Sequence, residues 1–327
     1  MPKVSVIIPT RNRVQLLQRA ITSVLRQTFD DFELLVVDDG STDGTRDAVD
    51  ARIDPRMRYL PQSESRGTAA ARNVGITSAA SPYCAFLDDD DEWLPDKLRL
   101  QIARIQAARP RVAVIATGYV EVDATTRGVI REWVPAGTGW GFDEVLTRGN
   151  LAPTSTILVK TDCFARVGLF DPSLTYGEDL DMWLRLTREF EIDAVAAPLT
   201  IISLQPNGLS RSYAVIAQGC DAFIRKNRTV LEGFPQVYAE RLRSLGTYYA
   251  FIGEMRKART AFRQAVAQDP ANLMTYACIA ASWMGSDIFK RLSTARNLLL
   301  ERAPQRIDGQ SKRAPSNRVS DSPQRGR

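Results

Sequence analysis

Short apolar runs alternate with amphipathic stretches along the first 116 residues, and this rhythm constrains the fold more than any other feature of the chain. The amphipathic stretches have the period of helices, as at 14–25, where apolar side chains recur every three or four residues. The apolar runs are continuous, as is typical of strands covered on both faces. They are VSVII (4–8), ELLVV (33–37), MRYL (57–60), YCAFL (83–87) and VAVIA (112–116). We therefore predict an α/β fold with a mostly parallel sheet and helices on both faces.

The pattern changes in the second half of the chain. The stretch 118–134 predicts an antiparallel hairpin that turns around Thr125 to Gly128, and 155–159 predicts another strand. A helix is expected at 178–189, and the chain from about 213 to 300 is helical throughout. We therefore expect an all-α extension after the sheet.

Within this extension, small and large residues between 239 and 272 fall at the spacing of one tetratricopeptide unit. In such a unit, small residues let two helices approach, large ones fix them, and proline ends the second helix. The matching positions are Leu245, Gly246, Tyr249, Gly253, Ala258, Phe262, Ala265 and Pro270. The alternative is a plain helical hairpin with coincidental spacing. Because about three repeats are needed for independent stability, we expect this segment to pack on the sheet domain.

Composition excludes several functions. The chain has no histidine, which removes His-ligated zinc, His-dependent triads and the usual proton shuttle near neutral pH. The net charge is +5, but residues 304–327 hold six Lys or Arg residues against two Asp residues, so most of this charge belongs to the tail. We therefore expect no nucleic-acid binding by the fold, and a disordered basic tail.

The cellular compartment is predicted from the cysteines and from hydropathy. The four cysteines form no CxxC pair and are typical of reduced thiols. No apolar run approaches the ~20 residues that span a bilayer, and the start MPKVSVIIPT lacks the layout of a signal peptide. We predict a cytoplasmic protein, with peripheral contact at the inner face of the membrane compatible with this sequence.

Polar clusters follow three of the predicted strands. PTRNR comes after the first, DDGSTDGT after the second and DDDDE after the fourth. Because ligands of open α/β sheets bind beyond the carboxyl ends of the strands, three such clusters on one rim predict a pocket. DDGSTDGT alone is equally compatible with a simple turn, since Asp, Gly, Ser and Thr are turn formers. It also lacks the spacing of dinucleotide and phosphate loops.

The acid run Asp88 to Asp91, with Glu92 behind it, needs an explanation. Two unit charges about 4 Å apart repel by roughly 1 kcal/mol in water and by about 4 kcal/mol at an effective dielectric near 20. One or two acids would suffice to cap the helix expected from Pro95 to about Ala108, with proline at its first position. Four in succession after a buried strand indicate a bound cation.

Five segments together resemble the family 2 glycosyltransferases, which have the GT-A fold. These segments are VSVIIPTRNR, LLVVDDGSTDGT, GTAAARNVGI, FLDDDDEWLPDKL and STILVKTDCFARVGLFDPSLTYGEDLDMWLRL, and the resemblance covers about residues 3–205. It implies a nucleotide-sugar-binding catalytic domain at 1–210. The helical pattern and the composition predict a helical extension at 211–303, with the repeat-like hairpin at about 239–272, and the basic tail at 304–327.

The resemblance also implies roles for the rim residues. Asp90 and Asp88 would be the ligands of Mn²⁺ or Mg²⁺, whose preference for oxygen suits carboxylates. Asp91 is extra, and we expect it to face solvent. The nucleotide-binding residues would be Pro9, Thr10, Arg11, Asn12, Asp38, Asp39, Arg72, Asp88 and Asp89. For Arg72, the alternative is a surface arginine that pairs with acids such as Asp39.

A second acidic motif is implied to do the chemistry. Asp179 would be the general base that takes the proton of the acceptor hydroxyl, with Glu178 beside it. The alternative is a capping box, since Thr175 precedes Glu178 by three residues. Trp140 and Trp183, and less so Trp93, are candidates to stack on sugar rings, although tryptophan is more often a core residue. Many GT-A enzymes use a late histidine as a metal ligand, and this chain has none.

The expected function is inverting transfer of a sugar from a nucleoside-diphosphate sugar, with UDP the commonest carrier in the family, to a hydroxyl of a glycan or lipid-linked acceptor. Cell-envelope or extracellular glycan assembly is the expected setting. The alternative is a catalytically inactive nucleotide-binding scaffold that recruits protein partners through its helical extension. A nucleotidyltransferase would need a Gly-rich phosphate loop that the sequence lacks.

Overall fold

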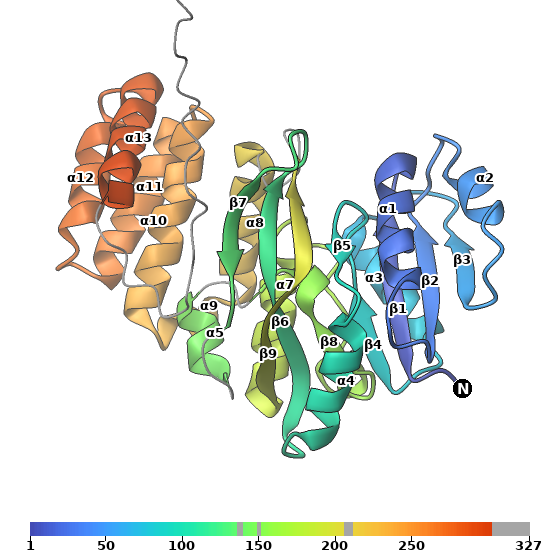
Figure 1. Ribbon diagram of the computed structural model, residues 1–327. Coiled ribbons are helices and arrows are strands. Elements are labelled where there is room, and N and C mark those ends of the chain that lie inside the picture. The colour runs from blue at the N-terminus through green and yellow to red at the C-terminus, as the bar shows by residue number, and fades with distance from the viewer. Residues whose placement is uncertain (136–139, 149–151, 206–211, 303–327) are drawn as a thin grey trace, which may run out of the picture.

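The computed structural model describes residues 1–135, 140–148, 152–205 and 212–302. In these residues the strands form one nine-stranded sheet, ordered β3-β2-β1-β4-β8-β6-β9-β5, with β7 paired to β6. The strands are β1 (Val4–Thr10), β2 (Phe32–Asp38), β3 (Met57–Pro61), β4 (Tyr83–Phe86), β5 (Glu92–Trp93), β6 (Val112–Asp123), β7 (Val129–Trp133), β8 (Leu158–Lys160) and β9 (Glu191–Leu204). The predicted α/β fold with a helical C-terminal extension is confirmed (Figure 1).

The first four strands run parallel, and their register aligns the polar clusters. Thr10 at the end of β1 pairs with Asp38 at the end of β2, and Ile7 pairs with Phe86 of β4. The segments that follow these strands therefore leave the sheet at one edge. As a result, residues far apart in the sequence meet at the rim where a ligand is expected.

The second half of the sheet is mixed. β8 is antiparallel to both β4 and β6, whereas β6 is parallel to β9. The predicted hairpin is confirmed as β6 and β7, while the strand expected at 155–159 begins with a 3₁₀ turn (Thr154–Thr156) and extends only over Leu158–Lys160. β9, with 14 residues, was not predicted. Its antiparallel pairing with β5 brackets the acid run between β4 and β5.

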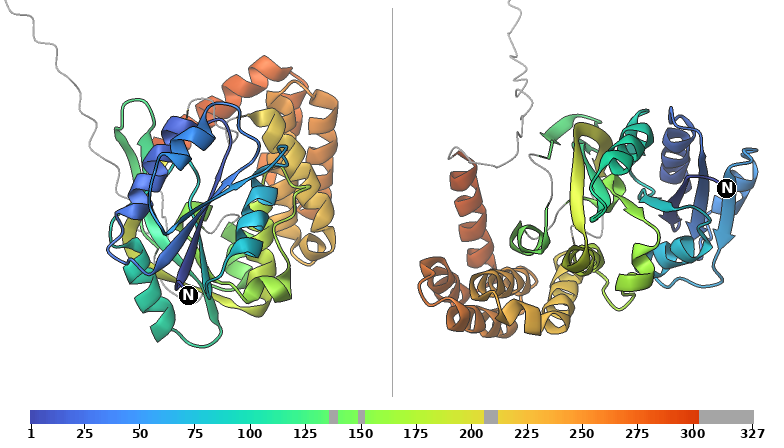
Figure 2. Two further views of the ribbon diagram at one scale, coloured as in Figure 1. Left: turned by 90° about the vertical axis from the view of Figure 1, so that its right-hand side faces the viewer. Right: turned by 90° about the horizontal axis from the view of Figure 1, so that it is seen from below.

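Helices cover both faces of the sheet, as expected (Figure 2). One face carries α1 (Val14–Leu25), α2 (Thr45–Asp50) and α4 (Lys97–Ala107). The other carries α3 (Thr68–Ser78), α5 (Phe142–Arg148), α6 (Cys163–Val167) and α7 (Glu178–Glu189). The expectation that α4 begins at Pro95 was wrong, because the first helical residue is Lys97 and Asp96 occupies the N-cap position.

The extension consists of α8 (Tyr213–Lys226), α9 (Arg228–Glu232), α10 (Pro235–Phe251), α11 (Met255–Gln268), α12 (Leu273–Ser282) and α13 (Ser286–Arg302). Apolar side chains of α8, α9 and α10, with Ala261 and Ala265 of α11, belong to the same core as the α3 and α7 face of the sheet. A smaller core around Phe262 is shared by α10, α11, α12 and α13. α10 and α11 pack so closely that a Cβ on Gly246 would lie 2.5 Å from the Phe262 ring. The tetratricopeptide assignment and the domain boundaries stay predictions.

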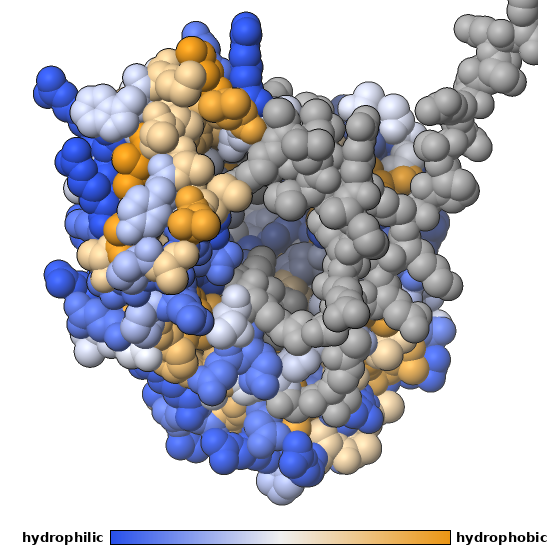
Figure 3. Space-filling model, turned by 90° about the vertical axis from the view of Figure 1, so that its left-hand side faces the viewer, coloured by the Kyte–Doolittle hydropathy of each residue, from blue (hydrophilic) through white to orange (hydrophobic). Residues whose placement is uncertain are grey.

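The outer side of the extension exposes several apolar side chains, among them Leu273, Trp283 and Met284 (Figure 3). None of the helices in the described ranges combines the length and the hydropathy that a bilayer crossing requires. The predicted basic tail at 304–327 lies outside the described residues.

Candidate active site

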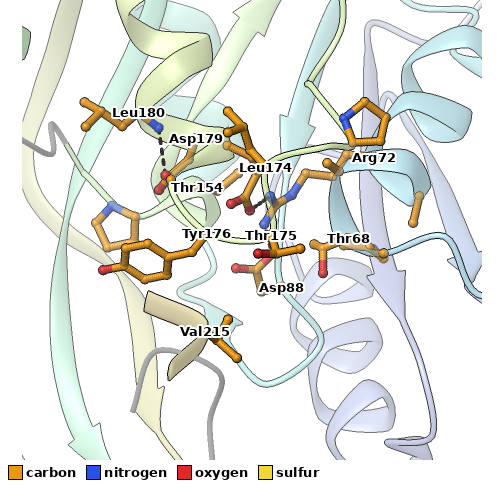
Figure 4. Close-up of a pocket in the computed structure, with 18 of the residues that line it drawn as sticks. Thr68, Arg72, Asp88, Thr154, Leu174, Thr175, Tyr176, Asp179, Leu180 and Val215 are labelled. Carbon is orange, nitrogen blue, oxygen red and sulfur yellow. Dashed lines mark hydrogen bonds and ion pairs between the residues drawn. The ribbon is translucent and has the colours of Figure 1, made fainter. Parts of the chain in front are cut away.

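A pocket of about 950 Å³ opens at the rim where the parallel strands end. Its walls come from the loops after β1, β2 and β4, from the first turns of α3 and α7, from the end of β9, and from α8 and α10. In Figure 4, Asp88, Arg72 and Asp179 lie on the sheet side of this pocket, and Val215 of α8 lies opposite. Both predicted acidic motifs therefore line a single cavity.

The acid run is held by cations and hydroxyl groups from the first rim cluster. Thr10 donates a hydrogen bond to Asp89 at 2.8 Å, and the Arg13 guanidinium contacts both Asp89 at 3.1 Å and Asp90 at 3.0 Å. Burial, and then the charges of Asp88 and Asp89, raise the pKa of Asp90 to about 6. Sequence reasoning missed Arg13, although it is the second arginine of PTRNR and therefore carried a signal.

Asp91 does not face solvent, so that expectation was wrong. Its side chain is buried, accepts a hydrogen bond from the Ser155 hydroxyl at 2.6 Å and accepts another from the Ser203 amide at 3.0 Å. Burial, followed by the charges of Asp90 and Asp88, raises its pKa well above the usual value. Asp91 thus ties the acid run to the 3₁₀ turn and to β9, although like its three predecessors it borders the pocket.

Arg72 joins the two acidic motifs. Its guanidinium is 3% exposed and forms ion pairs with Asp88 at 2.7 Å and with Glu178 at 2.8 Å (Figure 4). The alternative of a surface arginine paired with Asp39 is therefore wrong. Because a guanidinium presents several donors in a fixed planar arrangement, Arg72 sets the distance between the acid run and the start of α7.

Asp179 stands at the first turn of α7 and lines the pocket. It accepts a hydrogen bond from the Leu180 amide at 2.7 Å. Burial, and then the charge of Glu178, raise its pKa to about 6. The capping-box alternative for Glu178 is not supported, since α7 starts from Gly177 at φ +81° without any side-chain cap. Glu178 instead binds Arg72, and Asp179 keeps one carboxylate oxygen without a protein partner in the described structure.

Most, but not all, of the residues predicted to bind a nucleotide lie at the pocket. Of the predicted residues, the following line the cavity: Pro9, Thr10, Arg11, Asp39, Arg72, Asp88 and Asp89. Asn12 and Asp38 do not. Asn12 accepts a hydrogen bond from the Thr42 amide, and Asp38 accepts one from the Tyr59 hydroxyl. Both side chains therefore stabilise the loops at the strand ends and do not face the pocket. Asp39 accepts hydrogen bonds from three consecutive residues, Ser65 to Gly67, and so fixes the loop before α3.

The predicted sugar-stacking tryptophans are core residues. Trp183 is fully buried and packs edge-to-face on Phe170, and Trp140 lies against Trp133. Trp93 is also buried, and its indole donates to the Ser155 carbonyl at 2.7 Å. None of the three lines the pocket, so stacking on a sugar by these rings is excluded by their position.

The oxygen donors of the acid run fit a divalent cation that takes its other ligands from phosphate or water. Among the described side chains, no group of three or more His, Cys, Asp or Glu is arranged to hold a metal. Asp88 uses one oxygen for Arg72 and Asp90 uses one for Arg13, which leaves each an oxygen for another ligand. Mg²⁺ sites of this kind use one or two carboxylates and take the remaining ligands from substrate phosphates and water.

Comparison with known proteins agrees with this geometry. The model of the family "Glycosyl transferase family 2" matches residues 5–171. An uncharacterized glycosyltransferase from Rickettsia felis is 33% identical over 206 residues, which are 62% of this chain and 33% of the relative. The putative teichuronic acid biosynthesis glycosyltransferase TuaG from Bacillus subtilis is 30% identical over 190 residues, or 58% of this chain and 73% of the relative. The matched segment thus spans about a third of the length of the Rickettsia felis relative.

Solved structures share the fold at low identity. TarS 1-349 from S. aureus, in complex with UDP-GlcNAc, superposes with a TM-score of 0.61 at 18% identity and covers 96% of this chain and 97% of that one. The mannosyltransferase PcManGT from Pyrobaculum calidifontis, in complex with GDP-Man and Mn²⁺, gives 0.55 at 19% identity over 92% and 88% of the two chains. The family match covers half of the chain and includes the rim clusters and the acid run. The chain belongs to glycosyl transferase family 2.

Proposed function

We propose that the protein transfers a sugar from a nucleoside-diphosphate sugar to a hydroxyl group of an acceptor, with inversion at the anomeric carbon and with a divalent cation. The observation that carries this proposal is the pairing of the two acidic motifs across one pocket, with Arg72 bound to both. One motif suits a diphosphate with its metal, and the other presents a carboxylate to a second substrate.

Asp179 acts as the general base. Its pKa of about 6 leaves it ionised at neutral pH and still basic enough to accept a proton as the acceptor oxygen attacks. The new bond forms between this oxygen and the anomeric carbon while the bond from that carbon to the diphosphate breaks. The proton goes to Asp179, and no covalent bond to the protein is required.

The acid run serves the leaving group. Asp88 and Asp90 would hold the cation, and when bound it offsets the negative charge that develops on the departing diphosphate. Arg13 holds Asp89 and Asp90 in place, and Arg72 keeps Asp88 aligned with the motif that carries the base. These positioning groups orient the two reactants, which is a major part of catalysis when two substrates must meet.

The relatives support the substrate class and the setting. TuaG is named for teichuronic acid biosynthesis, and an Escherichia coli relative, 29% identical over 192 residues, is named as a UDP-Glc:alpha-D-GlcNAc-diphosphoundecaprenol beta-1,3-glucosyltransferase. We infer a UDP-linked donor, a glycan or lipid-linked acceptor, and a role in cell-envelope polysaccharide assembly at the cytoplasmic side of the membrane. The alternative of an inactive scaffold finds no support in these comparisons.

Release of nucleotide tests the proposal. The purified chain would be incubated with a panel of UDP- and GDP-sugars, with Mn²⁺ or with a chelator, and free UDP or GDP would be measured. Slow metal-dependent release from at least one donor, absent in Asp179→Asn, is the expected result. If no donor is bound or hydrolysed in the presence of Mn²⁺, the proposed activity is wrong.

A further inference from the structure

The helical extension supplies one wall of the pocket. Arg241, Ser244 and Tyr248 of α10 line it, and they fall at i, i+3 and i+7, which is one face of a helix. Gln218 of α8 lines it beside them. This wall, which we call the α8–α10 wall, therefore presents polar groups to a cavity whose opposite side carries the catalytic acids.

The α8–α10 wall is fixed relative to Asp179. A Cβ on Gly219 of α8 would lie 2.4 Å from the Cβ of Tyr176, so the helix sits directly on the loop that leads into α7. Lys226 at the end of α8 also forms an ion pair with Asp181 of α7 at 3.0 Å. Groups on the wall thus keep a set position with respect to the proposed base.

Arg241 is the cation of this wall, and within the described ranges it forms no ion pair, although the charge of the neighbouring Glu240 acts on it. Its guanidinium donates one hydrogen bond, from Nη2 to the Leu146 carbonyl at 3.2 Å, and within the described ranges no Asp or Glu oxygen lies at ion-pair distance. The other arginines beside the acids, Arg13 and Arg72, are both ion-paired. Burial lowers the pKa of Arg241, but an arginine stays protonated at neutral pH.

The groups whose charges act most on Arg241 are Glu240, Cys220, Tyr248 and Tyr176, whereas Asp88 and Asp90 are paired with Arg72 and Arg13. A partly buried cation without an ion-pair partner carries a desolvation cost that an incoming anion offsets. Guanidinium also binds carboxylate and phosphate through paired hydrogen bonds, so it selects for oxyanions.

Resting on the proposed function, we propose that the α8–α10 wall is the acceptor subsite and that Arg241 selects an acceptor with an oxyanion, a carboxylate or a phosphate, near the hydroxyl that is glycosylated. Ser244, Tyr248 and Gln218 supply neutral hydrogen-bonding groups around that anion. Arg241 is then a specificity-determining residue, and the donor end of the pocket does not depend on it.

Three sugars that differ only at C6 test the proposal. Glucose, glucuronate and glucose 6-phosphate would be titrated by ligand-observed NMR against the full chain saturated with UDP and Mn²⁺. We expect about tenfold tighter binding of at least one charged sugar than of glucose, as one charge-assisted contact provides. Preference for glucuronate or for glucose 6-phosphate identifies the source of the oxyanion. Equal binding of all three by the unmodified chain overturns the proposal.

Variants locate the effect. Arg241→Met should remove the preference, and Arg241→Lys should retain part of it, while UDP binding stays unchanged in both. Arg263→Met, an exposed arginine of α11 outside the pocket, is the matched control and should keep the full preference. A preference that survives in folded Arg241→Met contradicts the assignment. Absence of UDP binding in the unmodified chain would instead count against the proposed function. The three sugars would then be compared without nucleotide, so that the acceptor proposal is still tested.

Discussion

Arg72 of α3 and Glu178 of α7 are joined by an ion pair of 2.8 Å although they lie 106 residues apart in the sequence. The same guanidinium binds Asp88, so one buried side chain sets the relation between the acid run and the start of α7. Removal of Arg72 should therefore affect the stability of the fold and the chemistry together.

Arg72→Met should reduce both stability and activity. Removing the guanidinium leaves Asp88 and Glu178 as close carboxylates without a partner, and we expect the free energy of unfolding to fall by about 2 kcal/mol and turnover by at least about tenfold. Urea denaturation and UDP release would measure the two effects. Arg228→Met, which breaks only the exposed pair with Glu232, should change neither. An Arg72→Met variant with normal turnover would contradict the positioning role.

Turnover should rise with pH through about 6, because the pKa of Asp179 is raised to about 6 and only its ionised form accepts a proton. The rate should level off at about pH 7. Asp90 has a pKa of about 6 as well, so the profile must be taken at saturating donor and metal, with nucleotide binding measured alongside. A turnover rate that is flat from acid to neutral pH would argue against Asp179 as the base.

Asp179→Asn should abolish transfer and yet stabilise the fold. Loss of a general base costs about 10²- to 10⁴-fold in rate, while UDP binding should remain. The folded-state pKa lies above the unfolded one, so the ionised form weakens the fold at neutral pH. This penalty decreases as the pH falls below about 6 and is gone below the ordinary pKa of 3.8. Asparagine removes the penalty, and we expect the Tm at neutral pH to rise by about 2 °C. A lower Tm with retained activity would refute both parts.

Asp90→Ala and Asp91→Ala should impair different properties although the residues are neighbours: the first ligand binding, the second the stability of the fold. Asp90→Ala should weaken Mn²⁺-dependent UDP binding by about tenfold at nearly unchanged stability. Asp91→Ala should lower the free energy of unfolding by about 1–3 kcal/mol, because the Ser155 hydroxyl and the Ser203 amide lose their buried acceptor. Calorimetric titration and thermal unfolding separate the two, and the reverse pattern would show that the assignments are exchanged.

Gly219→Ala, a substitution in α8, should displace the loop before α7 and with it Asp179. The added methyl group meets the Cβ and the backbone of Tyr176 at 2.4 and 2.7 Å, so α8 or the loop before α7 must shift. We expect a loss of about 1–3 kcal/mol in stability together with a lower turnover rate. Gly141→Ala, whose new methyl would lie 3.5 Å from the Glu144 side chain, is the control. Turnover unchanged in Gly219→Ala would show that α8 does not position the base.

Much of the fold was predictable because the first strands are continuous apolar runs with clear turns between them. β9 was not predicted, since Pro198 interrupts it and its register against β6 shifts near Gly118. A proline within a run normally argues against a strand, because it cannot donate to the ladder. Here the neighbouring strand accommodates the irregularity through bulges.

The candidate site was predictable where its residues adjoin strand ends in the sequence, as for Asp88 to Asp90. The exceptions depend on tertiary contacts that no local pattern encodes. Asp91 is buried because Ser155 and Ser203 approach it from distant segments, and Arg13 reaches acids 76 residues away. Trp183 points into the core because its helix face packs on Phe170.

The close packing of Gly219 against Tyr176 limits where the genes of related proteins can be joined to make chimeras that fold. A crossover ahead of α8 would separate this helix from the backbone to which its glycine is fitted, and such chimeras should fold poorly. A breakpoint at Gly233, beyond α9, would keep that contact and exchange α10 together with Arg241. If α10 carries the proposed acceptor subsite, hybrids made there should keep the donor preference and change the acceptor preference.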